Sequence, residues 1–245
     1  MQKAVSEVLV ERRVVTKPKT GKVDVTPLEF SVDEMITLRS NASKSLSSVG
    51  KRFVDIALSG IGLIGLGLLL PLIALGIKLS SRGPIFFLQA RTGLDGKKFD
   101  CWKFRTMHNL EYETSNGTPD VTKKGDRRVF RFGRFLRRTN IDEIPQMINV
   151  LKGEMSLVGP RPYSVQESDY WTEIIPGFSL RNLVKPGITG WAQVTGYRGG
   201  NLCANHMNSR LRRDLKYIER YSIMLDAKII AKTILQMIHF KTNAH

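Results

Sequence analysis

Residues 56–77 read IALSGIGLIGLGLLLPLIALGI, and this stretch contains no charged side chain. A helix of about 20 apolar residues is long enough to cross the hydrocarbon core of a bilayer. The stretch therefore predicts a membrane-embedded helix. A helix buried in the core of a soluble protein would have the same composition, but such helices seldom remain uncharged over this length.

Positive side chains flank both ends of this stretch: Lys51 and Arg52 come before it, and Lys78 and Arg82 come after it. The distribution of positive charge therefore places neither end on a particular side of the membrane. Pro71 lacks a backbone donor and can interrupt the helix. Two arrangements of residues 51–82 remain: a re-entrant helix-break-helix with both ends on one face, and a spanning helix kinked at Pro71.

Residues 1–50 mix charged side chains with Ser and Thr and show no sustained hydrophobic period. Pro18, Gly21 and Pro27 interrupt any regular element there. The beginning also lacks the basic start, apolar middle and small-residue cleavage site of a secretory signal. We expect an N-terminal arm that is poorly ordered or peripheral.

The chain is strongly basic, with 38 Lys and Arg against 22 Asp and Glu and a formal charge of +16. Of this charge, +14 falls after residue 50, in the part of the chain that we expect to fold. An anionic partner is therefore expected, and nucleic acid, an acidic lipid surface and a phosphate-rich substrate are the classes that fit. Cys101 and Cys203 are too few for a disulfide framework or a zinc site.

Residues 83–245 are expected to form one mixed α/β, helix-rich domain. Glycine, proline and aromatic residues alternate after the apolar stretch, which predicts short strands and turns, and the basic string at 125–140 predicts a helix. Helical character resumes at 141–158 and again from 209 to 240. In the last helix, Ile230, Ile234 and Met237 share one face, which would pack on the core or lie on the membrane.

Asp142 and Glu143 are neighbours, and Pro145 follows them closely, so we place the pair at a helix start. A helix N-terminus and the nearby Arg137 and Arg138 would both favour ionised carboxylates. An ionised Asp can act as a nucleophile, and a neighbouring Glu can hold a divalent metal ion. The same pair could instead only cap the helix and balance the local arginine charge.

Basic residues stand near this pair in contexts that contain Gly and Pro: Arg91, Lys103, Arg105, Arg127, Arg134 and Arg161. Guanidinium groups match phosphate oxygens in geometry and charge. Neither a Walker loop nor a G-x-G-x-x-G string precedes a helix, so such side chains would have to bind the phosphates. Together with the acidic pair and the apolar stretch they indicate phosphoryl transfer at a membrane surface. The candidate substrate-phosphate ligands are Arg91, Lys103, Arg105 and Arg161.

Five strings carry a resemblance to a known family: KRFVDI at 51–56, GPIFFLQARTG at 83–93, KFRTM at 103–107, IDEIPQMINVLKGEMSLVGPRP at 141–162 and KPGITGWAQVTG at 185–196. In identity and order they resemble the bacterial sugar transferase family of polyprenyl-phosphate phosphoglycosyl transferases. The resemblance covers about residues 50–240. The GYRGG string at 196–200 is similar to that of undecaprenyl-phosphate glucose or galactose phosphotransferase catalytic domains.

The resemblance implies a single monotopic membrane domain with amphipathic helices at the membrane surface. Its re-entrant helix-break-helix at residues 51–82 would be broken at Pro71 and dip into one leaflet. The cytoplasmic phosphoglycosyl transferase domain, residues 83–245, would act at the cytoplasmic face of the bacterial inner membrane.

The same resemblance implies roles for individual residues. Asp142 would be the catalytic nucleophile, and Glu143 would be the ligand of a Mg²⁺ cofactor. The residues that face the substrate phosphates would be Lys103, Arg105 and Arg161. Asp214, from the string RRDLKYI, is added to these phosphate-binding residues.

The implied reaction transfers a sugar-1-phosphate from a UDP-sugar to polyprenyl (undecaprenyl) phosphate, and it yields UMP and a polyprenyl diphosphate sugar. A covalent phosphosugar-aspartyl intermediate would make the kinetics ping-pong. The product would initiate exopolysaccharide, capsule, O-antigen or glycoprotein glycan assembly, and downstream glycosyltransferases are possible partners. The donor sugar stays open.

Two other functional classes remain for comparison. A nucleic-acid-binding protein tethered to the membrane would use the basic charge, but no helix-turn-helix, zinc finger or RNP string is visible, and we expect no nucleic-acid partner. An inactive membrane scaffold of a polysaccharide assembly complex would have no physical need for a carboxylate pair among arginines.

Overall fold

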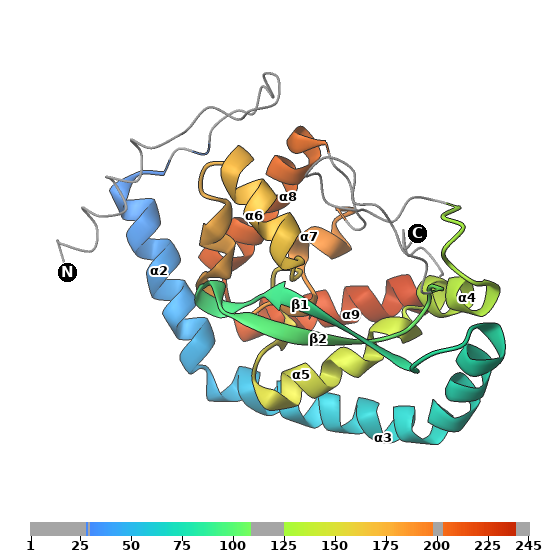
Figure 1. Ribbon diagram of the computed structural model, residues 1–245. Helices are drawn as coiled ribbons and strands as arrows, with labels where there is room; N and C mark the ends of the chain where they lie inside the picture. Colours follow the sequence, from blue (N-terminus) through green and yellow to red (C-terminus); the bar gives the residue numbers. More distant parts are fainter. Residues whose placement is uncertain (1–27, 29, 109–124, 198–202, 239–245) are drawn as a thin grey trace.

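The computed structural model describes residues 28, 30–108, 125–197 and 203–238. These residues form a helix-rich structure with two small sheets, as the sequence predicted (Figure 1). The α-helices are α2 Val32–Ser47, α3 Val49–Ser80, α4 Arg131–Thr139, α5 Met147–Lys152, α6 Val165–Ile174, α7 Trp191–Val194, α8 Ala204–Glu219 and α9 Ile223–Ile238. Short 3-10 helices occur at η2 Leu94–Gly96, η3 Ile141–Gln146 and η4 Phe178–Leu183.

Helix α2 corrects the expectation of a poorly ordered arm. The Ser31 hydroxyl accepts from the Glu34 amide at 3.2 Å, and the Glu34 carboxylate accepts from the Ser31 amide at 2.7 Å, which completes a capping box. Leu38 and Ala42 are buried in the main core, and Asn41 donates to the last turn of α8. The prediction is therefore wrong for α2, while residues 1–27 and 29 lie outside the described part.

Helix α3 contains the apolar stretch and is long and apolar enough to cross a membrane. Only 17% of its most apolar window is buried, so the alternative of a soluble core helix does not hold. The helix continues through Pro71 without an interruption, whereas a break was expected. In Figure 1 the helix runs along the lower edge and turns upward in its C-terminal part. A proline removes one hydrogen bond and bends a helix, but the neighbouring bonds can carry the helix past it.

One side of α3 packs on the rest of the protein and the other is bare. Leu66, Ile73 and Ile77 are buried with Phe104 and Leu136 in a second core cluster. The opposite face exposes large apolar side chains along the whole helix: Phe53, Ile56, Leu58, Ile61, Ile64, Leu68, Leu69, Leu72, Leu75 and Leu79. Such a continuous apolar surface is what a lipid-facing helix presents.

Both ends of α3 are fixed to the same folded unit. At the start, Lys51 Nζ lies 2.7 Å from the Asp226 carboxylate of α9, and Asp55 accepts from the Leu157 amide at 2.8 Å. At the far end, the Arg105 guanidinium donates to the carbonyls of Ser81 and Arg82 at 2.6 and 2.8 Å. The helix therefore leaves and returns to one domain.

The strands form two separate pairs. Strands β1 Phe86–Thr92 and β2 Lys98–Phe104 are antiparallel, while β3 Ser156–Val158 and β4 Gly187–Thr189 are parallel. The short β3 lies in the core and leads directly into the GPRP segment at 159–162. The hairpin confirms the strands expected after the apolar stretch.

The C-terminal region is two helices rather than one. The predicted helix at 209–240 is interrupted after α8, and α9 restarts behind Ser222, whose hydroxyl accepts from the Leu225 amide at 3.1 Å. Ile229 is fully buried, whereas Ile234 and Met237 are 51% and 39% exposed. Ile234 and Met237 therefore do not pack on the core, and of the two predicted alternatives for this face, contact with the membrane stays a prediction.

Candidate functional site

The acidic pair is held by a sharp change of direction between α4 and η3. Asn140 ends α4 in the left-handed conformation, with φ 59°, and its carbonyl accepts from the Glu143 amide at 3.2 Å. Asp142 and Glu143 stand in the first turn of η3, and Pro145 follows within it. The predicted helix start is confirmed, and both carboxylates are buried, at 8% and 7% exposure.

Glu143 gathers two cations from separate elements. Lys103 of β2 donates to its Oε1 at 2.9 Å. Arg161 of the GPRP segment donates to Oε1 at 2.7 Å and to Oε2 at 3.1 Å, which makes a forked pair. Residues that are 40 and 18 positions away in the chain thus meet at one carboxylate. The structure brings together three of the residues singled out from the sequence.

Asp142 has different surroundings from its neighbour. Among the described residues, no hydrogen bond or ion pair engages its carboxylate. Burial, and then repulsion from Glu143, raise the pKa of Asp142 to about 6, although Lys103, Arg137 and Arg161 act in the opposite direction. Arg137 favours the ionised form of Asp142, as predicted, but burial and Glu143 outweigh it in the net pKa. A carboxylate with a raised pKa is ionised at neutral pH and more basic than an ordinary one.

The two cations differ in how burial affects them. Burial lowers the pKa of Lys103, although Glu143 opposes this effect. Attraction to Glu143 raises the pKa of Arg161, so this guanidinium is always charged. Arg161 therefore stays positively charged, whereas burial makes the ammonium group of Lys103 easier to deprotonate.

Arg91 and Arg105 have their donors turned toward the protein. Arg91 donates to the Pro162 carbonyl at 2.6 Å and to the Gln89 side chain at 3.0 Å, so it holds the GPRP segment. Arg105 donates to the Pro84 carbonyl at 2.5 Å besides its bonds at the end of α3. In this structure both guanidinium groups are thus engaged with the protein, and the contact of Arg91 and Arg105 with substrate phosphates stays a prediction.

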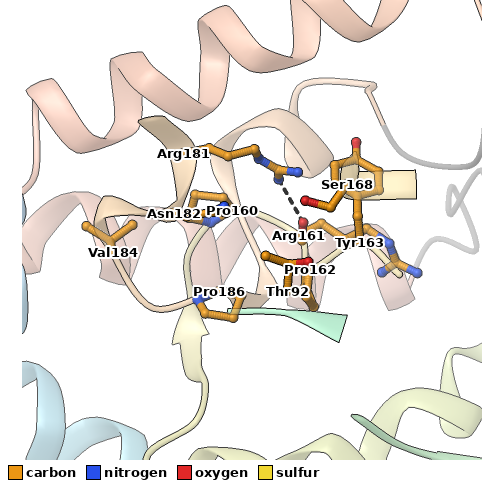
Figure 2. Close-up of a pocket in the computed structure, with 10 residues that line it drawn as sticks. All are labelled: Thr92, Pro160, Arg161, Pro162, Tyr163, Ser168, Arg181, Asn182, Val184 and Pro186. Atoms are coloured by element: carbon orange, nitrogen blue, oxygen red, sulfur yellow. Dashed lines mark hydrogen bonds between the residues drawn. The ribbon is translucent and has the colours of Figure 1, made fainter. Parts of the chain in front are cut away.

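Asp214 does not reach the acidic pair directly. Its carboxylate is buried and lies 2.8 Å from Arg181, and burial raises its pKa. Arg181 in turn donates to the Arg161 carbonyl at 2.7 Å, which is the dashed contact in Figure 2. In the structure Asp214 therefore pairs with an arginine that contacts the backbone of Arg161, and its role as a phosphate ligand stays a prediction.

The sequence reasoning missed Arg181, which also lies over the ring of Tyr163, 4.3 Å from its centroid. No motif marks this arginine, because its importance comes only from the fold. The cavity that it lines beside the GPRP segment in Figure 2 has a volume of about 10 Å³. Such a space holds at most one water molecule, so it is not the binding site of a sugar nucleotide.

The acidic pair offers oxygen atoms of the kind that Mg²⁺ prefers. No cluster of three His, Cys, Asp or Glu side chains is found within residues 28, 30–108, 125–197 and 203–238. Mg²⁺ commonly binds through one or two carboxylates and completes its shell with water and substrate phosphates. Glu143, with Asp142 beside it, fits this mode, provided that Glu143 exchanges one of its ion pairs for the metal ion.

Comparison with known proteins shows the family of the chain. Residues 46–240 match the family described as Bacterial sugar transferase. The chain is 45% identical over 194 residues to the UDP-glucose:undecaprenyl-phosphate glucose-1-phosphate transferase of Xanthomonas campestris pv. campestris, covering 79% of this chain and 40% of that protein. It is 41% identical over 219 residues to a protein of the same name from Caulobacter vibrioides, covering 87% of this chain and 80% of that protein.

A relative with a different donor is nearly as similar. The UDP-N-acetylgalactosamine-undecaprenyl-phosphate N-acetylgalactosaminephosphotransferase of Aeromonas hydrophila is 41% identical over 222 residues, which cover 90% of this chain and 50% of that protein. The chain spans about two fifths of the length of several glucose-1-phosphate transferases that it matches. The match nevertheless covers most of this chain, and the chain belongs to the bacterial sugar transferase family.

Proposed function

We propose that the protein transfers a sugar-1-phosphate from a UDP-sugar to undecaprenyl phosphate, giving UMP and undecaprenyl diphosphate sugar. The observation that carries the proposal is the buried pair Asp142 and Glu143, which meets Lys103 and Arg161 beside an exposed apolar helix. The names of the relatives support it, since they specify this acceptor and two UDP-sugar donors.

In the first step, an Asp142 oxygen attacks the phosphorus that bears the sugar. The bond from that phosphorus to the bridging oxygen breaks, and the oxygen leaves with UMP. Arg161 and Lys103, which bind the neighbouring Glu143, would offset the charge on the phosphate oxygens. A Mg²⁺ ion at Glu143 would supply further positive charge on the pyrophosphate.

In the second step, a phosphate oxygen of the acceptor attacks the same phosphorus. The bond to Asp142 breaks, the aspartate returns as a carboxylate, and the sugar phosphate leaves on the lipid. UMP thus departs before the acceptor reacts, which is a ping-pong sequence. Asp142 is suited to attack because its carboxylate is free and basic. Glu143, in contrast, is already bound to cations.

The proposal includes a re-entrant position for α3 at the cytoplasmic face of the inner membrane. Lys51 at the start of α3 and the segment after its end both bind the same folded unit. A straight spanning helix would separate these contacts by the thickness of the bilayer, about 30 Å of hydrocarbon. The bend in α3 instead allows its exposed side to enter one leaflet while both ends stay with the domain (Figure 1).

The first test is UMP release from UDP-glucose, UDP-galactose and UDP-N-acetylgalactosamine by the detergent-solubilised protein with Mg²⁺, with and without undecaprenyl phosphate. We expect one donor to be used, and Asp142→Asn to abolish release. Asp169→Asn is the matched control, because this residue is exposed on α6. Failure of every donor with folded protein would favour the inactive scaffold.

The covalent step has its own test. With labelled UMP and unlabelled UDP-sugar but no acceptor, a phosphosugar-enzyme returns label to the donor. We expect this exchange in the wild type and the Asp169→Asn control and its loss in Asp142→Asn. Activity that requires the acceptor before any exchange occurs would show a direct transfer and remove Asp142 as nucleophile.

A further inference from the structure

A basic hollow lies on the surface between α8 and α9, apart from the acidic pair. Its volume is about 250 Å³, and Lys216 and Arg220 of the α8 end and Lys228 of α9 line it. Trp191 and Met224 form apolar parts of the wall. None of the residues proposed above for the chemistry lines this hollow.

The three cations of the hollow are not neutralised by the protein. All three are exposed, and no acidic side chain lines the hollow. Within the described chain, none of them forms an ion pair. The nearby Asp226 is already paired with Lys51 and accepts from the Tyr217 hydroxyl at 2.8 Å. The hollow is therefore complementary to an anion.

One rim of the hollow continues into the apolar surface of α3. Met224 is 65% exposed and its neighbour Ile223 is 50% exposed. Ile223 touches the start of α3, since a Cβ atom at Gly50 would lie 3.0 Å from its Cδ1. Val49 and Phe53 beside it are 82% and 71% exposed. Exposed apolar side chains thus lie both at the rim of the hollow and at the start of α3, and the two elements meet at Ile223 and Gly50.

We propose that this hollow binds the phosphate headgroup of an anionic phospholipid, whose chains run over Ile223 and Met224 toward α3. The inference rests on the proposed membrane position of α3. Positive charge alone would suit any phosphate, but the apolar rim favours a ligand that is anionic at one end and apolar at the other. The bound lipid would fix the height of α9 at the membrane surface.

The test compares phosphatidylglycerol with phosphatidylcholine by native mass spectrometry of the full chain in detergent. Lys216→Gln, Arg220→Gln and Lys228→Gln are combined in one variant. The matched control combines Lys97→Gln, Lys98→Gln and Arg212→Gln, which removes the same charge from exposed positions outside the hollow. Unfolding temperatures of both variants establish that they are folded.

We expect the wild type and the control to bind phosphatidylglycerol at least about tenfold more tightly than phosphatidylcholine. The hollow variant should lose this preference and keep UMP release in detergent. Equal binding of both lipids by the wild type, or loss of the preference in the control as well, would overturn the proposal.

Two competitors identify the source of the phosphate. Millimolar inorganic phosphate that displaces the lipid fully would indicate a site for free phosphate and contradict the inference. Undecaprenyl phosphate that competes at the hollow, together with loss of acceptor use in the hollow variant, would make this the acceptor site and also contradict it. Preferential lipid binding without UMP release would instead support the site and defeat the proposed function.

Discussion

Asp142 and Glu143 are consecutive residues that the fold treats in opposite ways. Glu143 is neutralised by Lys103 and Arg161, whereas the described residues leave the Asp142 carboxylate without a hydrogen bond. A nucleophile has to keep its oxygen available, and a charge-holding residue has to be engaged. This difference is consistent with the division of labour that we propose for the pair.

The raised pKa of Asp142 predicts that Asp142→Asn stabilises the protein. The folded-state pKa of about 6 exceeds the value of 3.8 for a free Asp, so the protonated carboxyl contributes stability that is fully present below about pH 4 and is lost as the pH rises through about 6. A neutral amide should therefore raise the free energy of unfolding at pH 7.5 by roughly 1–3 kcal/mol. The gain should vanish near pH 4.

Thermal unfolding in detergent at both pH values measures this effect. Asp169→Asn, at an exposed position, should change the unfolding temperature little at either pH. An Asp142→Asn protein that unfolds at a lower temperature at pH 7.5 would show that the buried carboxylate is stabilised after all.

Transferase activity should depend on the ionisation of the same group. Because attack requires the ionised carboxylate, UMP release should fall about tenfold per pH unit below the pKa of about 6. Lys103 lowers the pKa of Asp142, so Lys103→Met should move this acid limb to higher pH. Lys98→Met, at an exposed position of the same strand, should leave the limb unchanged. Identical profiles for all three proteins would assign the limb to another group.

At the residue scale, the sequence predicted the acidic pair, Lys103 and Arg161, because their types and strings carry the chemistry. It could not show the partners of Arg105 and Asp214, since arginine and aspartate look alike in sequence whether they face a substrate or a buried partner. The partners of Arg105 are backbone carbonyls beyond α3, and that of Asp214 is Arg181. Only the folded chain brings these groups together.

Among the structural elements, α3 shows how glycine sets the packing of a helix. A Cβ atom at Gly76 would lie 2.5 Å from the ring of Phe132 on α4, whereas at Gly67 it would meet nothing within 4 Å. The ring is partly buried and packs against the second core cluster, so moving it would disturb these contacts. The apolar stretch is thus glycine-rich partly because α4 has to approach closely.

Gly76→Ala should therefore destabilise the protein by about 1–3 kcal/mol, because the added methyl group forces α3 and α4 apart. Gly67→Ala is the matched control on the same helix and should be neutral or stabilising by up to about 1 kcal/mol, since alanine favours helix. Unfolding temperatures in one detergent compare the two. An equal loss of stability at both positions would mean that the close approach of Phe132 is not the reason for the glycine at position 76.

Element boundaries were predicted less well than element types. The capping box at Ser31 and Glu34 was visible in the sequence, but the surrounding charges and breakers concealed α2. Pro71 is a strong signal for a break, yet α3 continues through it with a bend. The interruption between α8 and α9 has no proline or glycine to mark it, so periodicity alone ran the two together.

On the scale of the whole molecule, α3 has to satisfy both lipid and protein. Its buried polar start binds α9 and β3, while its far end is closed by Arg105. Both sets of contacts can form together when the two ends of α3 lie on the same side of the bilayer, as we propose. The positive residues at either end, which left the orientation open from sequence, can then face the same aqueous side.

Cysteine labelling tests this arrangement in a Cys203→Ser background, since Cys101 is buried. Ser47→Cys and Arg82→Cys report the two ends of α3 from exposed positions, and Leu69→Cys reports its exposed apolar face. A membrane-impermeant maleimide should label both end positions in inverted inner-membrane vesicles and neither in intact spheroplasts. Leu69→Cys should stay unlabelled in both, because lipid covers it.

The pattern of the two end positions decides between the arrangements. Labelling of one end only in vesicles and of the other only in spheroplasts would establish a spanning helix, and the contacts of α3 with α9 and with Arg105 could then not coexist. Labelling of both ends from the same side requires the chain to turn within the membrane. The bend at the C-terminal part of α3 would then be the structural means by which a helix that starts at the active-site domain returns to it.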